Sequence, residues 1–165
     1  MKDIIFDGFL EAKNQGIEGG DPAILVDEAF GLQVQKKAKD MGIKFAAPVE
    51  KSGQKVFDFE YGDDFGEKIK EVNADFVKIL VRWNPDDDTD TRQVQGERIK
   101  LLSDWIDENE RKFLLEFLVP ASEQQLESVG GDQARYDSEI RPKLAVQVVE
   151  EMSCLLYTSD AADES

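Results

Sequence analysis

The chain has 165 residues, with 36 Asp and Glu against 20 Lys and Arg, so its formal net charge is −16. Its length predicts one domain, and a composition of 41% hydrophobic and 34% charged residues is typical of a soluble globular protein. No apolar run approaches the roughly 18 to 20 residues of a membrane span, and residues 1–20 lack a secretory signal pattern. We expect a cytoplasmic protein with neither a membrane nor a nucleic-acid partner, because an acidic chain repels phosphate backbones.

Helices and strands alternate along the predicted chain. Apolar spacing predicts helices over 3–13, 29–40, 63–72, 91–109 and 136–152, and a short helix capped by Ser122. Strands are expected over 23–26, 43–49, 76–83 and 112–120, with a possible short strand over 56–60. The run 23–26 should be buried on both faces, and Val94, Leu101, Leu102, Trp105 and Ile106 should form the inward stripe of helix 91–109. This alternation predicts an α/β fold with a parallel sheet.

Several common site types lack their residues. There is no histidine, which excludes Ser-His-Asp triads and zinc–histidine sites. No glycine pattern of a dinucleotide or nucleoside-triphosphate site is present. The acidic loop 85–90 resembles a calcium loop, but Thr91 stands where the sharp turn needs glycine, so these acids are expected to cap the next helix. We therefore predict no cofactor and no metal.

Two charged residues lie in the middle of predicted strands. Lys78 alternates with Leu80 and Arg82 on one face of strand 76–83, and Glu116 lies within strand 112–120. A buried charge costs several kcal/mol unless it is paired or solvated. If the strands are neighbours, Lys78 and Glu116 meet in the interior, either as a catalytic acid/base pair or as an ion pair that fixes strand register.

Polar residues also gather where the strands end. Asp27 and Glu28, Glu50 and Lys51, and Arg82 and Asn84 each follow a predicted strand. Open α/β sheets and (β/α)8 barrels collect their catalytic residues at this edge. Arg82 and Lys51 are the cations available to hold a phosphate or carboxylate there, beside the glycine-containing loop 51–54.

The C-terminal residues break with the rest of the chain. Cys154 is the only cysteine, and residues 154–164 match a transposase adapter from sequencing-library preparation translated in frame. We therefore expect a native domain over 1–153 and a non-native tail over 154–165.

Five segments carry a family resemblance: Ile24–Gly31, Pro48–Gln54, Phe57–Gly62, Val77–Pro85 and Leu114–Pro120. They resemble the 2-deoxy-5-keto-D-gluconate 6-phosphate aldolase domain family of myo-inositol breakdown, which is similar to the class I tagatose-bisphosphate aldolases. The resemblance covers nearly all of residues 1–153. It implies a TIM barrel that cleaves a ketose or keto-deoxy-sugar-acid phosphate through a lysine Schiff base, giving a three-carbon phosphate and an aldehyde.

The resemblance also implies roles for single residues. Lys78 and Glu116 match the family's active-site lysine and glutamate, and Asp27, Glu50, Lys51 and Arg82 would contact the substrate. The family's Schiff-base lysine lies on a later strand, in a pattern like Asp-x-x-Lys-x-Glu, which this chain lacks. We therefore expect a partial (β/α)8 barrel, about half of it present, that is inactive alone and self-associates through open strand edges as a homo-oligomer.

Two other classes of function remain open from the residues alone. One is a non-catalytic α/β module that binds a sugar phosphate. The other is a metal-dependent lyase that uses Asp27, Glu50 and Glu116.

Overall fold

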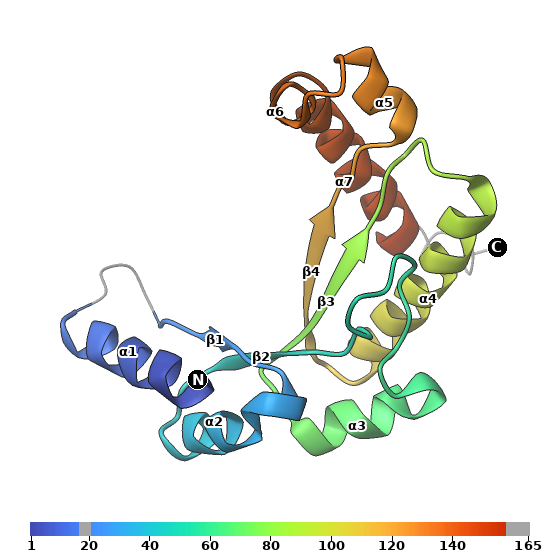
Figure 1. Ribbon diagram of the computed structural model, residues 1–165. Coiled ribbons are helices and arrows are strands. Elements are labelled where there is room, and N and C mark those ends of the chain that lie inside the picture. Colours follow the sequence, from blue (N-terminus) through green and yellow to red (C-terminus); the bar gives the residue numbers. More distant parts are fainter. Residues whose placement is uncertain (17–20, 158–165) are drawn as a thin grey trace.

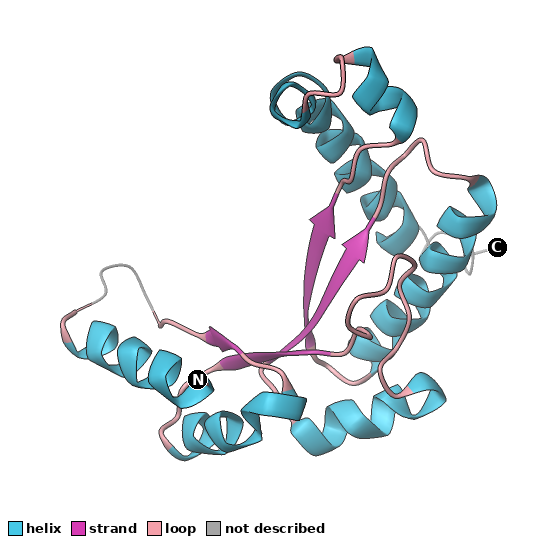
Figure 2. Ribbon diagram, viewed as in Figure 1, coloured by secondary structure: helices cyan, strands magenta, loops and turns pink. Residues whose placement is uncertain are grey.

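The computed structural model describes residues 1–16 and 21–157, in which four parallel strands alternate with helices (Figures 1 and 2). The strands are β1 (Ile24–Leu25), β2 (Phe45–Pro48), β3 (Phe76–Arg82) and β4 (Lys112–Leu118), and they lie side by side in chain order. The longer helices are α1 (Lys2–Asn14), α2 (Glu28–Asp40), α3 (Phe65–Val72), α4 (Thr89–Glu108) and α7 (Arg141–Tyr157). The predicted α/β fold with a parallel sheet is confirmed.

Short helical segments complete the chain. They are the 3-10 turn Gly62–Asp64, α5 (Glu123–Ser128), α6 (Gln133–Arg135) and the π-helical turn Tyr136–Ile140. Ser122 caps α5 in a full capping box with Gln125, and Asp88 caps α4 by accepting a hydrogen bond from the amide of Thr91, both as expected.

The helices pack against one face of the sheet, which we call the outer face. Val77, Ile79 and Val81 of β3 are buried there against Ile99, Leu102 and Ile106 of α4 and Val148 and Met152 of α7. A second cluster buries Phe45 and Ala47 of β2 against α1 and α2. Figure 1 shows α2, α3 and α4 following one another along this side of the curved sheet.

The opposite, inner face carries no layer of helices among the described residues. On β4 it presents Leu114, Glu116 and Leu118, and the two leucines are 45% and 41% exposed. The expectation that strand 23–26 is buried on both faces is wrong, since β1 has two residues and Leu25 is 53% exposed. No layer formed by the described residues covers this side chain.

The segment between β2 and α3 is a folded loop. The expected strand over 56–60 is reduced to one antiparallel bridge between Glu50 and Phe59. Phe59 stacks on Phe65 with ring centroids 4.3 Å apart, and Phe57 meets Phe59 edge to face. These rings bury the loop against the outer-face core, which fixes the position of Glu50.

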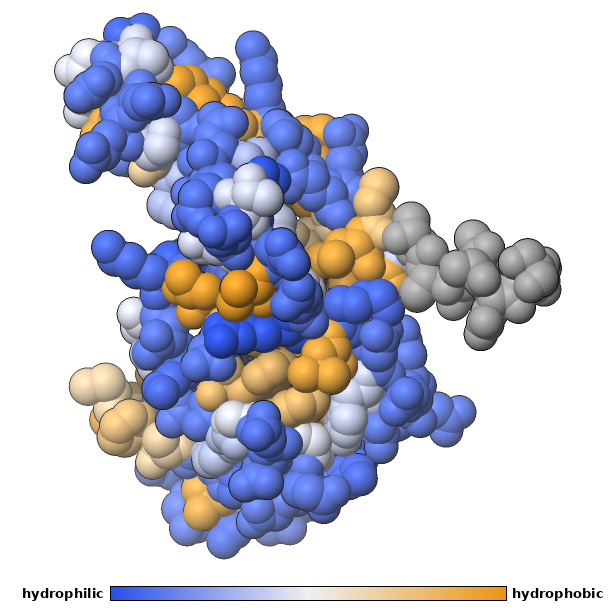
Figure 3. Space-filling view, turned by 90° about the vertical axis from the view of Figure 1, so that its right-hand side faces the viewer, coloured by the Kyte–Doolittle hydropathy of each residue, from blue (hydrophilic) through white to orange (hydrophobic). Residues whose placement is uncertain are grey.

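The stripe predicted for helix 91–109 is wrong in part. Leu102 and Ile106 are buried, whereas Val94 is 40% and Leu101 is 54% exposed. Gln95 takes the inward position instead, because it donates to the carbonyl of Arg82 and accepts from the amide of Phe57. On the molecular face that carries α4, apolar side chains reach the surface in patches among hydrophilic ones (Figure 3).

Helix α7 continues past the expected end of the native sequence at residue 153. Leu155 and Leu156 pack against the outer-face core, and residues 158–165 of the predicted tail lie outside the described residues. Gly19 and Gly20 also lie outside them. None of the described helices is both long and apolar enough to cross a bilayer.

Gly31 lets the start of α2 approach β1, and its substitution tests this packing. A Cβ atom at Gly31 would lie 2.5 Å from Cγ2 of the buried Val26, whereas a Cβ atom at Gly8 of α1 meets nothing within 4 Å. We expect Gly31→Ala to lower the free energy of unfolding by about 1 to 3 kcal/mol through overpacking. The control Gly8→Ala should raise it by about 0.5 to 1 kcal/mol through helix propensity.

Urea unfolding measures both changes. The loss in the double variant Gly31→Ala/Val26→Ala should be smaller than the sum of the two single losses, since Val26→Ala removes the methyl group that the new Cβ meets. Equal effects of the two glycine substitutions would contradict the packing argument.

Candidate functional site

Lys78 is the centre of a charged cluster on the inner face. The residue is only 5% exposed, and its ammonium lies 2.8 Å from Oε1 of Glu50 and 3.2 Å from Oε2 of Glu116. We call these three residues the lysine cluster. Since Leu80 pairs with Glu116 in the β3–β4 register, the carboxylate reaches Lys78 diagonally from the neighbouring strand. The expected approach of Lys78 and Glu116 is confirmed.

Glu50 is the closer partner of Lys78, and the sequence did not reveal it. Its side chain is 16% exposed, and its Oε2 atom is buried without a hydrogen bond from the described residues. A buried carboxylate oxygen without a donor costs free energy, so this atom is an open acceptor. The arrangement follows from the register that places Pro48 beside Lys78, with Glu50 two positions further along the chain.

Glu116 occupies a different environment from Glu50. Its side chain is 49% exposed because, among the described residues, β4 is the last strand of the sheet and no layer of helices covers this face. The expectation that both members of the pair lie in the interior is therefore wrong for Glu116. One carboxylate of the lysine cluster is held in place and the other is open to solvent.

Arg82 and Lys51 line a small pocket of about 170 Å³ at the carboxyl ends of β2 and β3, which we call the loop pocket. Glu50, Gly53, Gln54 and Leu80 also line it. Arg82 donates to the carbonyl of Gln54 at 2.9 Å, and Gly53 has a φ of +75°, a conformation that glycine adopts without strain. The loop pocket thus brings Lys51 and Arg82 together beside the lysine cluster.

Asn84 fastens the loops that follow β3 and β4. Its buried amide donates to the carbonyl of Pro120 at 2.8 Å and to Oε1 of Gln125 at 2.7 Å, and its Oδ1 accepts from the amide of Asp86. The side chain is therefore fully used in joining two loops at the edge that carries the site.

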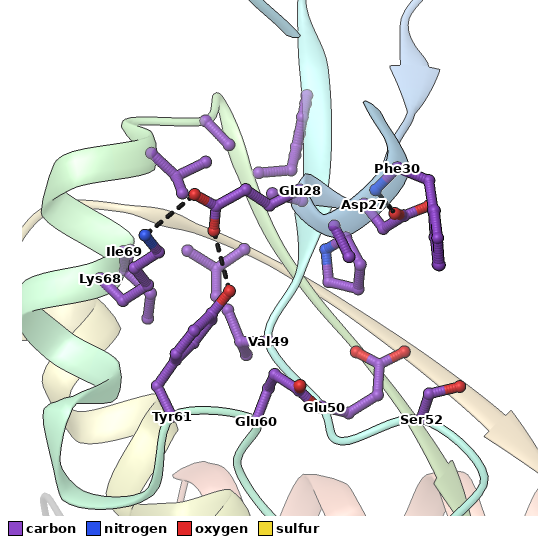
Figure 4. A pocket seen from close by; sticks show the side chains of 17 residues that line it. Asp27, Glu28, Phe30, Val49, Glu50, Ser52, Glu60, Tyr61, Lys68 and Ile69 are labelled. Carbon is purple, nitrogen blue, oxygen red and sulfur yellow. Dashed lines mark hydrogen bonds and ion pairs between the residues drawn. The ribbon is translucent and has the colours of Figure 1, made fainter. Parts of the chain in front are cut away.

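A larger cavity of about 460 Å³ lies between the start of α2, the end of β2 and α3. We call it the α2–α3 cavity, and Figure 4 shows it from close by. Asp27 and Glu50, two of the expected substrate contacts, both line it, and Glu50 lines the loop pocket as well. Asp27 is engaged as the cap of α2, where it accepts from the amide of Phe30 and pairs with Lys2.

Glu28, Tyr61 and Lys68 close one wall of the α2–α3 cavity. Tyr61 donates to Glu28 Oε2 at 2.9 Å, and Lys68 lies 2.9 Å from Glu28 Oε1 (Figure 4). Burial raises the pKa of Tyr61 above its ordinary 10.0, and the hydrogen bond to Glu28 raises it further. The hydrogen bonds to Glu28 and Glu71 raise the pKa of Lys68, so it stays an ammonium. Sequence reasoning missed this group, whose members come from separate elements.

The described part of the chain contains no group of three Asp, Glu or Cys side chains arranged to hold a metal ion. Asp27 caps α2 and pairs with Lys2, whereas Glu50 and Glu116 both pair with Lys78. The donor set of the metal-dependent alternative is therefore not assembled.

The two carboxylates around Lys78 should differ in their effect on stability. Glu50→Gln leaves the buried ammonium with a solvent-exposed partner, so we expect a loss of about 2 kcal/mol in the free energy of unfolding. Glu116→Gln is the matched control, and its loss should be below about 1 kcal/mol because solvent screens that pair. Denaturant unfolding measures both losses, provided that the slope of the free energy against denaturant concentration is unchanged. A larger loss for Glu116→Gln than for Glu50→Gln would contradict the difference between the two carboxylates.

Tyr61 should titrate above pH 10 in the folded protein. Because the pKa of Tyr61 is higher in the folded than in the unfolded protein, its hydrogen bond to Glu28 stabilises the fold at pH values below 10. This stabilisation is lost as the pH rises through the folded pKa. Subtracting the phenolate absorbance of Tyr61→Phe from that of the wild type isolates the titration of Tyr61. Glu28→Gln should lower the pKa of Tyr61 toward 10 but not to 10, because the ring stays partly buried. The exposed control Glu108→Gln should leave the pKa of Tyr61 unchanged.

The comparisons with known proteins give one family. Residues 1–143 match the family model DUF2090, described as "Uncharacterized protein conserved in bacteria". No curated protein matches the chain. The matched residues include all four strands and the whole lysine cluster, and the chain belongs to the DUF2090 family.

Proposed function

We propose that this domain is part of a class I aldolase that cleaves a ketose or keto-deoxy-sugar-acid phosphate. The observation that carries the proposal is the lysine cluster, a buried ammonium between a fixed and an exposed carboxylate on the inner face of a parallel sheet. The segments that resemble the deoxy-keto-gluconate-phosphate aldolases contain all three residues.

A partial (β/α)8 barrel is the architecture that agrees best with this sheet. The strands lie in the order β1-β2-β3-β4, each beside its sequence neighbour, as in barrels. Doubly wound sheets instead reverse their strand order and carry helices on both faces. Here the helices pack on one face, and the other face has charged and partly exposed side chains, as the inside of an incomplete barrel would.

The roles within the lysine cluster follow from exposure. Glu116 is accessible and acts as the acid/base, accepting the proton of the substrate hydroxyl as the carbon–carbon bond breaks. Lys78, an ammonium between two carboxylates, has no free electron pair and orients a substrate oxygen by donating a hydrogen bond. Glu50 positions Lys78 from its buried side. The Schiff base itself belongs to a different lysine, in keeping with the resemblance.

The phosphate of the substrate would bind in the loop pocket. Arg82 uses one guanidinium nitrogen on Gln54 and keeps others for an anion, and Lys51 adds a second cation. The pocket lies at the carboxyl ends of the strands, the edge where barrels bind their substrates.

The test uses the protein expressed from its complete gene. Incubation with dihydroxyacetone phosphate and borohydride should give a covalent adduct, which mass spectrometry should locate on a lysine other than Lys78. Lys78→Met should lower turnover of the sugar phosphate by about 100-fold or more, the usual effect of losing an acid/base or orienting group. The matched control Lys100→Met, which removes a half-buried lysine of α4 that pairs with Asp104, should retain turnover.

Three outcomes would contradict the proposal. The absence of an adduct would remove the Schiff-base mechanism, and loss of turnover in chelator would favour a metal-dependent lyase. Binding of sugar phosphate without turnover would favour a non-catalytic module, in which the lysine cluster only fixes the register of β2, β3 and β4.

A further inference from the structure

We infer that Gln95 of α4 is a positioning residue for the loop pocket, because its buried amide holds together the two segments that build the pocket. This role rests on the proposed binding of a substrate phosphate in the pocket, which Gln95 itself would not touch. It makes α4, a helix of the outer face, a determinant of how tightly a site on the inner face binds an anion.

The loop pocket is built from two separate segments. One is the end of β3, which carries Arg82, and the other is the loop 50–57 after β2, which carries Lys51. The parallel pairing of β2 with β3 ends at Pro48 and Lys78. It therefore does not align the loop with Arg82, and the separation of the two cations of the pocket depends on other contacts.

Gln95 makes one hydrogen bond to each segment. Its Nε2 donates to the carbonyl of Arg82 at 3.1 Å, and its Oε1 accepts from the amide of Phe57 at 2.7 Å. Arg98, three residues further along α4, donates to the carbonyl of Phe57 at 2.6 Å. Both backbone groups of Phe57 are thus held by α4, and Gln95 ties this part of the loop to the backbone that carries the Arg82 guanidinium.

Gln95 takes the place of a strand partner that β2 does not supply. The amide of Trp83 donates to the carbonyl of Leu118 on β4 at 2.9 Å, so the preceding carbonyl, that of Arg82, points to the other side of β3. That side faces β2, whose last residue is Pro48. Because β2 ends before it reaches Arg82, the side-chain amide of Gln95 pairs with this carbonyl instead.

The burial of Gln95 indicates that these two hydrogen bonds are its role. The residue is 0% exposed, on the buried side of α4 that also carries Ile99 and Leu102. A buried amide costs free energy unless its polar atoms are paired, and an apolar side chain of similar length avoids that cost. A glutamine is favoured here because it satisfies the backbone groups of Arg82 and Phe57 that meet at this point.

The contact is important for anion binding because another link between the two segments is made by the anion-binding group itself. The guanidinium of Arg82 donates to the carbonyl of Gln54 at 2.9 Å. An anion that engages this guanidinium competes with that hydrogen bond. The hydrogen bonds of Gln95 go to the backbone and stay in place when the pocket is filled. Gln95 therefore keeps the loop ordered before binding, which spares the entropic cost of ordering it.

The test uses the 165-residue chain and inorganic phosphate, measured by nuclear magnetic resonance. Phosphate should shift the amide signals of Ser52, Gly53 and Gln54 in the wild type. Gln95→Met keeps the length of the side chain and removes both hydrogen bonds, so it should weaken phosphate binding by about 10-fold. It should also speed the hydrogen exchange of the Phe57 amide, because the loop is no longer held on β3.

Two control variants of α4 separate positioning from general destabilisation. Ile99→Val removes a methyl group from the buried core one turn away from Gln95, and it should lower stability but leave the phosphate affinity and the exchange at Phe57 unchanged. Gln93→Met makes the same chemical change as Gln95→Met at an exposed position of the same helix. It should alter neither phosphate binding nor exchange.

Turnover by the protein expressed from its complete gene gives a third measurement. The pocket would bind the phosphate equally in the ground state and in the transition state. Gln95→Met should therefore raise the KM for the sugar phosphate by about 10-fold with kcat nearly unchanged. Lys78→Met, in contrast, should lower kcat.

The outcomes for Gln95 and for the proposed function can be told apart. Wild-type phosphate affinity in Gln95→Met, or an equal loss in Ile99→Val, would overturn the positioning role and leave the phosphate site intact. The absence of phosphate shifts in the wild type would contradict the phosphate site of the proposed function and the role of Gln95 with it. A fall in kcat without a change in KM would also overturn the positioning role.

Discussion

The structure depends on how it accommodates one buried ammonium. Lys78 lies in the middle of β3, where an unpaired charge would cost several kcal/mol, and it is 5% exposed. Two carboxylates stabilise it, one from the segment after β2 and one from β4. The pairing therefore joins three consecutive parts of the sheet through side chains as well as through backbone hydrogen bonds. A shift of β3 by one residue would move Lys78 into the apolar outer face, so the charge specifies the register strongly.

The same alternation separates two kinds of chemistry on the two faces of β3. Val77, Ile79 and Val81 supply the outer-face core, and Lys78, Leu80 and Arg82 supply the inner face. Helices can cover the first set because it is apolar. The second set needs water, ions or a substrate, since packed helices would leave its charges without partners. The apolar core of this sheet therefore lies on its outer face, and its charged side chains lie on its inner face.

Much of the fold, and one pair of the site, could be predicted from the sequence. Side chains alternate between the two faces in the predicted strands 76–83 and 112–120. This alternation is sufficient to predict the contact between Lys78 and Glu116, because adjacent parallel strands can pair in few registers. Glu50 could not be assigned to Lys78, since that contact depends on the β2–β3 register and on the bridge between Glu50 and Phe59. Val94 and Leu101 were misplaced because apolar spacing cannot reveal that Gln95 is needed inside to satisfy two backbone groups.

Glu50 lies on the boundary between the inner and outer faces, and this position links the two sites. Its carboxylate lines both the loop pocket and the α2–α3 cavity, with one oxygen on Lys78 and the other unpaired. Any group that changes the pairing of Glu50 therefore also changes the pairing of Lys78, because the two residues form one ion pair. A single carboxylate at the end of β2 is enough to connect the two spaces, since it lines both of them.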